Sequence, residues 1–305
     1  MKGEIAMIER ILALKEEKNA LILAHYYQTT DIHELADHVC DSFEMARRAQ
    51  AAHEDVLIIC GVHFMAESAK ILNPDKTVLL PAPDAECPMA DMIEPEDVIK
   101  LRARYPAAAV VCYVNSSAAV KAVSDICCTS SSAEKIVRSL PHKQIIFVPD
   151  QNLGAYVAKK VPEKEVILFE GFCPTHDRIS ESDVLDAIAM HPGAKLLFHP
   201  ECREEALRHA DYIGSTAGII NAALESGGRE FIIGTEIGVV ERLRKLAPDK
   251  TFHPLTNGFI CPNMKKCRPD DVLNSLEHGE FEITLQPAEI AAARESLERM
   301  VELGM

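Results

Sequence analysis

Three cysteines in this chain are each followed directly by proline, at Cys87-Pro88, Cys173-Pro174 and Cys261-Pro262. They are the only Cys-Pro pairs among the 10 cysteines, and they lie 86 and 88 residues apart. Even spacing of a rare dipeptide indicates one structural unit that occurs three times, each copy supplying one thiolate. Three thiolates that meet would bind zinc or an iron–sulfur cluster and leave one coordination position open. Proline suits a tight loop around such a site, because it fixes φ and lacks an N–H.

The rest of the sequence supports a threefold repeat of strands and helices. Short β-branched runs alternate with helical patterns, which is typical of α/β folds with parallel strands. Each copy is predicted to run strand, helix, helix, strand, helix, strand and then cysteine. The expected strands are 20–27, 56–60 and 77–81 in the first copy, 109–115, 144–148 and 166–170 in the second, and 195–201, 231–234 and 251–255 in the third. The sequence therefore predicts three similar α/β/α units around a central cavity.

The repeat also suggests where the domains begin and end. A chain of 305 residues exceeds the usual size of one domain. We expect a first unit at residues 1–95, a second at 96–182 and a third at 183–272. The helical tail, residues 273–305, is expected to pack back on the first unit.

Composition and charge limit the kinds of partner. Hydrophobic residues make up 48% and charged residues 26% of the chain, as in a globular protein. A net charge of −15 argues against nucleic acid as a partner. Residues 1–19 form a charged amphipathic pattern, and no run approaches the ~18 apolar residues of a membrane span. We therefore expect a cytoplasmic protein without membrane contact, where clustered cysteines indicate metal binding or catalysis rather than disulfides.

Polar side chains recur at matching places in the three copies. The carboxyl ends of the expected first strands carry His25 and Tyr27, then Tyr113 and Asn115, then His199 and Glu201. Ser42, Ser130 and Thr216 fall at the start of each second helix. In parallel α/β units, ligands bind beyond the carboxyl ends of the strands. Helix N-termini present free N–H groups and a positive dipole end, so three of them would bind carboxylates or phosphate.

Structural explanations exist for several of these residues. A hydroxyl at a helix start is by itself usually a cap, and repeated capping is the alternative reading of this pattern. Tyr27 and Tyr113 have the alternative role of closing the core. Cys267 follows Cys261 by six residues and is either a spare thiol or a redox partner of Cys261.

Six segments resemble the quinolinate synthase family, the iron–sulfur enzymes of de novo NAD biosynthesis. They are AHYYQ at 24–28, GVHFMAESAKIL at 61–72, PDQNLGAY at 149–156, GFCPTH at 171–176, HPECR at 199–203 and CPNMKK at 261–266. Each segment is several residues long, the segments follow the family's order, and the resemblance covers essentially the whole chain.

The resemblance implies a fold, a cofactor and a reaction. The family has three similar α/β domains related by a pseudo-threefold axis, with the active site in the central cavity. It binds one [4Fe–4S] cluster through three cysteines, which correspond to Cys87, Cys173 and Cys261, and the remaining iron acts as a Lewis acid. The family condenses iminosuccinate with dihydroxyacetone phosphate to quinolinate, releasing phosphate and two waters. An enzyme that supplies iminosuccinate is then expected as a transient partner.

The resemblance also assigns residues to substrate and to chemistry. By similarity the substrate-binding residues are His25, Ser42, Tyr113, Asn115, Ser130, His199, Glu201 and Thr216. Tyr27 is expected to take part in the chemistry, with His25, His199 and Glu201 as further acid/base candidates. His176 is expected near the cavity.

Two other functions stay open at this stage. A [4Fe–4S] hydro-lyase would use the same open iron on a single substrate, and an iron–sulfur or zinc sensor would not need the polar residues at the strand ends. One departure from the family also matters. Some relatives have a C-x-x-C-x-x-C run around the third ligand, whereas this chain has only Cys261 and Cys267 there. Thiol–disulfide regulation is therefore not carried over.

Overall fold

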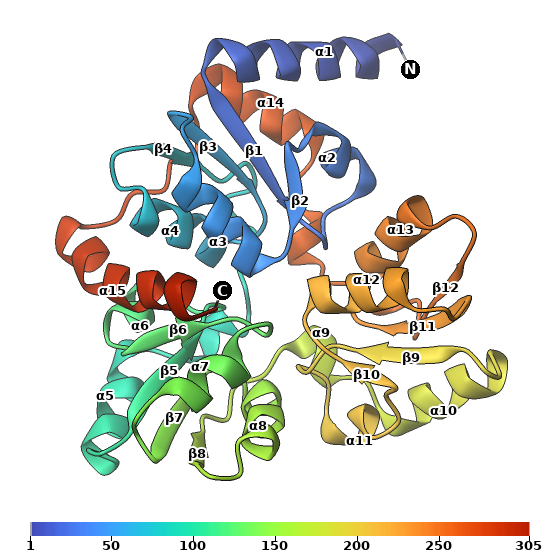
Figure 1. Ribbon diagram of the computed structural model, residues 1–305. Helices are drawn as coiled ribbons and strands as arrows, with labels where there is room; N and C mark the ends of the chain where they lie inside the picture. The colour runs from blue at the N-terminus through green and yellow to red at the C-terminus, as the bar shows by residue number, and fades with distance from the viewer. Residues whose placement is uncertain (1, 305) are drawn as a thin grey trace.

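Three four-stranded parallel sheets, one in each repeated unit, form the frame of the molecule (Figure 1). The computed structural model describes residues 2–304. The strand order is the same in each unit: β2-β1-β3-β4, β6-β5-β7-β8 and β10-β9-β11-β12. Figure 1 shows the units around a common centre, with the first at the top, the second at the lower left and the third at the right. The predicted fold class is confirmed.

The elements of each unit follow one another in the predicted alternation of strands and helices. The first unit contains α1 (Lys2–Glu17), β1 (Ala20–His25), α2 (Thr30–Leu35), β2 (His38–Cys40), α3 (Ser42–Ala51), β3 (Val56–Cys60), α4 (His63–Leu72) and β4 (Thr77–Leu79). The second contains α5 (Pro95–Arg104), β5 (Ala109–Tyr113), α6 (Ala118–Ala122), β6 (Ile126–Cys128), α7 (Ala133–Ser139), β7 (Gln144–Val148), α8 (Gln151–Lys160) and β8 (Glu165–Leu168). The third contains α10 (Glu181–Met190), β9 (Lys195–Phe198), α11 (Glu204–Leu207), β10 (Tyr212–Ile213), α12 (Thr216–Glu225), β11 (Glu230–Gly234), α13 (Ile237–Leu246) and β12 (Thr251–Pro254).

One strand in each unit was missed by the sequence patterns. β2, β6 and β10 lie between the two helices that follow the first strand, and they have only 3, 3 and 2 residues. A run this short cannot show the period that distinguishes a strand from a loop. Each of these strands pairs in parallel with the first long strand of its unit, so the unit has four strands rather than the predicted three.

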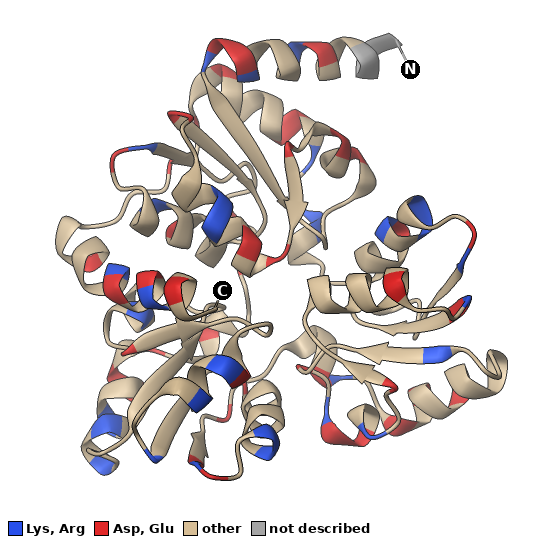
Figure 2. Ribbon diagram, viewed as in Figure 1, with Lys and Arg blue, Asp and Glu red and all other residues tan. Residues whose placement is uncertain are grey.

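The two middle strands of each sheet are largely buried, whereas the edge strands β8 and β12 are more exposed. In β3, for example, every residue after Val56 is buried, which is the continuous apolar run typical of parallel sheets. Figure 2 shows that charged residues lie mainly on helices and loops, whereas the strands are largely free of them.

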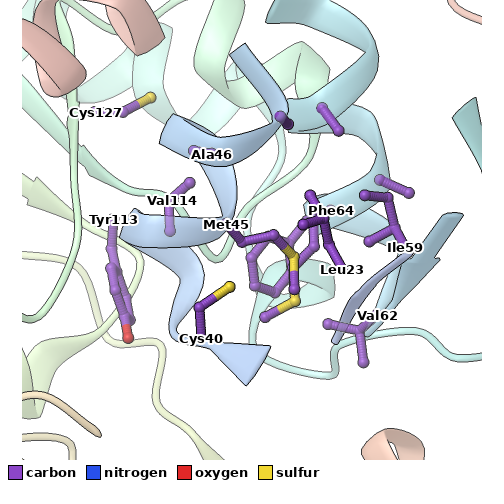
Figure 3. Close-up of a cluster of buried hydrophobic side chains, with 14 of the residues drawn as sticks. Leu23, Cys40, Met45, Ala46, Ile59, Val62, Phe64, Tyr113, Val114 and Cys127 are labelled. Atoms are coloured by element: carbon purple, nitrogen blue, oxygen red, sulfur yellow. The ribbon is translucent and has the colours of Figure 1, made fainter. Parts of the chain in front are cut away.

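The first two units share a hydrophobic core. Figure 3 shows Met45 of α3 and Phe64 of α4 beside Val114, which directly follows β5. These three side chains belong to one buried cluster that extends through both units. Part of the third unit has a separate cluster, which includes Phe198 and Phe259.

The C-terminal tail lies in two places. Helix α14 (Pro269–His278) packs on α1 and α2 of the first unit, as the sequence predicts for the tail. Helix α15 (Pro287–Gly304) instead packs mainly against α6 and β6 of the second unit, and also contacts α4 of the first (Figure 1). Ser296 of α15 donates a hydrogen bond of 3.1 Å to the backbone oxygen of Lys121, which fixes the helix on the second unit. The domain boundaries 1–95, 96–182 and 183–272 stay a prediction.

In residues 2–304, no helix combines the length and the apolar character that a membrane crossing requires.

Gly234 provides a test of how tightly the third sheet is packed. A Cβ atom at this position would lie 2.4 Å from Cδ1 of Phe198, whose side chain is fully buried. We expect Gly234→Ala to lower the free energy of unfolding by about 1–3 kcal/mol, because the ring has no free space to move into. Gly227→Ala is the control, since its Cβ would meet no atom within 4 Å. Urea unfolding measures both, and equal stability of the two variants would contradict this packing.

Candidate active site

The three units bring the carboxyl ends of their first strands to one cavity of about 240 Å³. His25 is the last residue of β1, Tyr113 is the last residue of β5, and His199 directly follows β9. All three line the cavity, as expected for ligand sites beyond the carboxyl ends of parallel strands.

The site residues predicted from the sequence line this cavity. Its lining includes Cys87, Cys173 and Cys261, together with His25, Tyr27, Ser42, Tyr113, Asn115, Ser130, His176, His199, Glu201 and Thr216. Cys267 lies outside this lining and is hydrogen-bonded with Cys60 instead. Arg178 was not predicted from the sequence. Among the described residues, it is the one lysine or arginine in the lining.

Each of the three cysteines begins a short helical turn. The turns are Ala90–Met92 after Cys87, α9 (Pro174–Asp177) after Cys173, and Asn263–Lys265 after Cys261. Backbone N–H groups two or three residues further along hydrogen-bond each sulfur: those of Met89 and Ala90, of His176, and of Asn263 and Met264. The predicted tight loop is therefore a helical turn whose free N–H groups face a sulfur atom.

The three thiols are free, and burial keeps them neutral in the absence of a cation. Burial raises the pKa of Cys87 to about 12, and also raises the pKa values of Cys173 and Cys261. All three thiols line the same cavity. A buried set of thiols that binds a metal releases its protons to the solvent and gains the charge of the ion in return. This donor set therefore fits a metal site, with soft sulfur ligands from all three units.

Glu201 is the centre of a buried hydrogen-bond network beside the Cys173 thiol, and one ligand atom each of Cys173, His176 and Glu201 lies within 4.8 Å of the other two. The Tyr113 hydroxyl donates to its Oε1 at 2.6 Å, and His176 Nδ1 lies 2.8 Å from its Oε2. Burial alone would raise the pKa of Glu201, but the attraction of His199 and His176 and these hydrogen bonds together lower it. Glu201 is therefore held as a carboxylate inside the cavity.

A chain of hydrogen bonds connects Glu201 to Tyr27. His176 Nδ1 faces the Glu201 carboxylate and also lies 3.2 Å from Cys173 Sγ, while His176 Nε2 is hydrogen-bonded with Thr235 Oγ1 at 3.0 Å. Thr235 Oγ1 is in turn hydrogen-bonded with the Tyr27 hydroxyl at 2.8 Å. Burial, followed by the nearby charge of Glu201, raises the pKa of Tyr27, so Tyr27 keeps its proton. The arrangement can move a proton between Tyr27 and His176.

The sequence analysis missed Thr235 and gave His176 no role beyond proximity. Thr235 directly follows β11, which lies beside β9 in the third sheet. The rule for carboxyl ends of parallel strands could have found it, because the rule applies to the middle strands as well as to the first.

His25 and His199 are both neutral at physiological pH. Burial, with smaller contributions from His33 and His199, lowers the pKa of His25 to about 3. Burial likewise lowers the pKa of His199 to about 4, although Glu201 opposes this. The backbone N–H of Tyr27 donates to His25 Nδ1 at 3.1 Å, which leaves Nε2 as the nitrogen that carries the proton. His199 Nε2 lies 3.2 Å from Ser130 Oγ.

Two of the three predicted helix starts are present. Ser42 and Thr216 are the first residues of α3 and α12, and the side chains of Asp41 and Ser215 cap these helices. The prediction is wrong for Ser130. A turn closed by the N–H of Ser132 on the oxygen of Thr129 precedes α7, so the helix begins only at Ala133. Ser130 still lines the cavity, but from this turn.

Asn115 offers an unused acceptor. Its Oδ1 is buried and has no hydrogen-bond partner in the structure. Because buried polar atoms are nearly always satisfied, an orphaned acceptor in a cavity lining indicates a ligand that donates to it.

Comparison with known proteins agrees with this site. The family model described as "Quinolinate synthetase A protein" matches residues 9–302. A relative from Caldicellulosiruptor saccharolyticus, named quinolinate synthase, is 54% identical over 302 residues, which cover 99% of this chain and 100% of the relative. Relatives of the same name from Methanoregula boonei and Thermodesulfovibrio yellowstonii are 52% and 48% identical, each over 97% of this chain and over 97% and 98% of their own lengths.

The match thus extends across all three units and every residue of the cavity lining. The resemblance seen in the six sequence segments is confirmed over the whole chain. This chain belongs to the quinolinate synthetase A family.

Proposed function

We propose that this chain condenses iminosuccinate with dihydroxyacetone phosphate in the central cavity, releasing phosphate and two waters to give quinolinate. We further propose that Cys87, Cys173 and Cys261 hold a [4Fe–4S] cluster for this reaction. The observation that carries the proposal is that one cavity is lined by a thiol from each of the three units and by an ionised carboxylate that a chain of hydrogen bonds connects to Tyr27.

Part of this function is already established by the comparisons. The predictions of an enzyme, of quinolinate synthesis and of a place in NAD biosynthesis are confirmed by the family and by the names of the relatives. The family implies a metal cofactor, and the chain contains residue groups suited to a metal. The cluster type, the two substrates and the residue roles are proposals.

Among the described residues, three cysteines line the cavity. This number suits a cluster in which one iron is not bound by cysteine. When bound, such a cluster supplies a Lewis acid that assists the loss of water. Cys267, the other cysteine near the third position, is hydrogen-bonded with Cys60 outside the cavity lining, which favours Cys261 as the ligand.

The proton transfers are proposed to run through the chain's own side chains. Glu201, held as a carboxylate, is suited to accept a proton from the substrate. Tyr27, held protonated, is suited to donate one, and its hydroxyl is connected by hydrogen bonds to Thr235 and through Thr235 to His176. Removing water from the substrate requires both an acid and a base, and this network has one of each in the same cavity.

The remaining lining residues are proposed to bind and orient the anionic substrates. Ser42 and Thr216 stand at the N-termini of α3 and α12, where free N–H groups and the helix dipole favour carboxylate or phosphate. Ser130, Tyr113 and neutral His25 and His199 add hydrogen-bond donors, and Asn115 adds an acceptor for a substrate hydroxyl or amine.

Formation of quinolinate by the anaerobically purified protein, with both substrates present, tests the reaction. A hydro-lyase would act with one of the two substrates alone, and a sensor would turn over neither.

The ligand set is tested by paired cysteine variants. Cys173→Ala should abolish the visible iron–sulfur absorbance and the bound sulfide, because a cluster held by two thiolates is lost. Cys267→Ala is the matched control and should keep both, since Cys267 lies outside the cavity lining. Four irons per chain retained in Cys173→Ala, or lost in Cys267→Ala, would reject the ligand set.

The role of Glu201 is tested by a change that keeps its shape. Glu201→Gln should lower kcat by roughly 10²–10⁴ while the cluster is retained, because an amide cannot accept the proton. Glu67→Gln is the matched buried control, since Glu67 accepts from the N–H of Ala118 and lies outside the cavity lining. Its kcat should stay within about threefold of the wild-type value, a loss well below that expected for a proton-transfer group. Near-normal turnover in Glu201→Gln would remove this residue from the chemistry.

The neutral state of His25 predicts a pH dependence of stability. Its pKa is about 3 in the folded protein and about 6.5 when exposed, so the unfolded chain binds more protons as pH falls. His25 therefore lowers the free energy of unfolding by roughly 2 kcal/mol between pH 7 and pH 5. His25→Gln should remove that part of the slope in urea unfolding of the cluster-free chain, whereas His53→Gln, at an exposed position, should not. Equal slopes in wild type and His25→Gln would show that His25 is not held neutral.

A further inference from the structure

A second group of metal-ligating side chains lies in the third unit, outside the cavity lining. It consists of His191, Glu230 and His253, and we call it the His-Glu-His group. One ligand atom from each residue lies within 4.8 Å of the other two. His253 Nε2 is 2.9 Å from Glu230 Oε1, and His191 Nδ1 is 4.0 Å from the same oxygen.

The backbone holds these residues on three different elements. Glu230 is the first residue of β11 and His253 lies in β12, and the two strands are hydrogen-bonded in parallel. His191 is the C-cap of α10, and its backbone N–H bonds to the oxygen of Ala187 at 3.0 Å. Pro192 and Gly193, which has a φ of 89°, then turn the chain into β9. The group therefore does not depend on a long flexible loop.

The distances are close to those that a metal requires. Zinc binds histidine nitrogen at about 2.0–2.1 Å and carboxylate oxygen at about 2.0–2.2 Å, which places tetrahedral ligand atoms about 3.3 Å apart. The two measured separations from Glu230 Oε1 lie on either side of that value. The imidazole rings are stacked with centroids 3.5 Å apart and planes at 14°, so one ring must rotate for both nitrogens to face one ion. Such a rotation about a terminal side-chain torsion is soft.

The ligand types favour a borderline divalent ion. Two imidazoles and one carboxylate suit zinc, nickel or copper, whereas magnesium and calcium prefer oxygen ligands. The side chains of His191, Glu230 and His253 are 28%, 44% and 21% exposed, so an ion can enter and water can complete the coordination.

We propose that the His-Glu-His group is a second metal site of this protein, which binds one Zn²⁺ per chain and joins the end of α10 to β11 and β12. Because β12 leads to the loop that contains Cys261, an ion here also stabilises the sheet from which that loop starts.

Zinc titration of the anaerobic holoenzyme tests the proposal. After removal of loosely bound metal, calorimetry with zinc chloride should detect one site per chain. His191→Gln, His253→Gln and Glu230→Gln should each lower the zinc affinity of that site by roughly tenfold or more. The reason is that losing a direct ligand weakens metal binding at least as much as losing a residue that is hydrogen-bonded to a ligand. The iron–sulfur absorbance of each variant shows whether its fold is kept. Because three variants are measured, the test still holds if one of them misfolds.

His209→Gln is the matched control. His209 Nε2 lies 2.7 Å from Glu181 Oε1, so this pair resembles the contact of His253 with Glu230 but lacks a second histidine in its ligand group. The control should bind zinc as the wild type does. Zinc binding that is undiminished in His191→Gln, or absent from the wild-type holoenzyme, would overturn the proposal, and the group would then be only a pair of stacked histidines hydrogen-bonded to Glu230. Neither result bears on quinolinate formation.

Discussion

The convergence of three helical turns on one cavity is the constraint on which the site depends. Each turn presents a cysteine sulfur to its own free N–H groups, and each follows the last strand of a parallel sheet. Burial makes the thiolate form of these cysteines unfavourable without a cation. The energetic cost of three buried thiolates is offset when one metal centre binds all three sulfur atoms. Metal binding would then depend on the relative positions of the three units.

Burial and hydrogen bonding give the ionisable side chains of the cavity different charge states. Glu201 is ionised because Tyr113 and His176 donate to it, while His25 and His199 are neutral because they are desolvated. An anion, two uncharged donors and a protonated tyrosine thus lie within one small volume. Neutral histidines offer N–H donors to an anionic substrate without adding positive charge to the cavity.

Repetition made most of this arrangement predictable from the sequence. The Cys-Pro spacing, the polar residues at the ends of the first strands and the hydroxyl residues expected at the starts of the second helices identified the fold class and twelve residues that line the cavity. Features without a repeated signal were missed. The short strands β2, β6 and β10 have too few residues to show a period, and the turn before α7 displaced Ser130 from a helix start. Thr235 directly follows β11 and was missed because the rule for carboxyl ends was applied only to the first strand of each unit.

The most direct test of the account is a crystal structure of the anaerobically purified protein with anomalous diffraction measured at the iron edge. We expect one compact iron signal in the central cavity, bonded to the sulfur atoms of Cys87, Cys173 and Cys261, with one iron that no cysteine binds. Iron bound elsewhere, or three uncoordinated sulfur atoms around an iron-free cavity, would contradict the account.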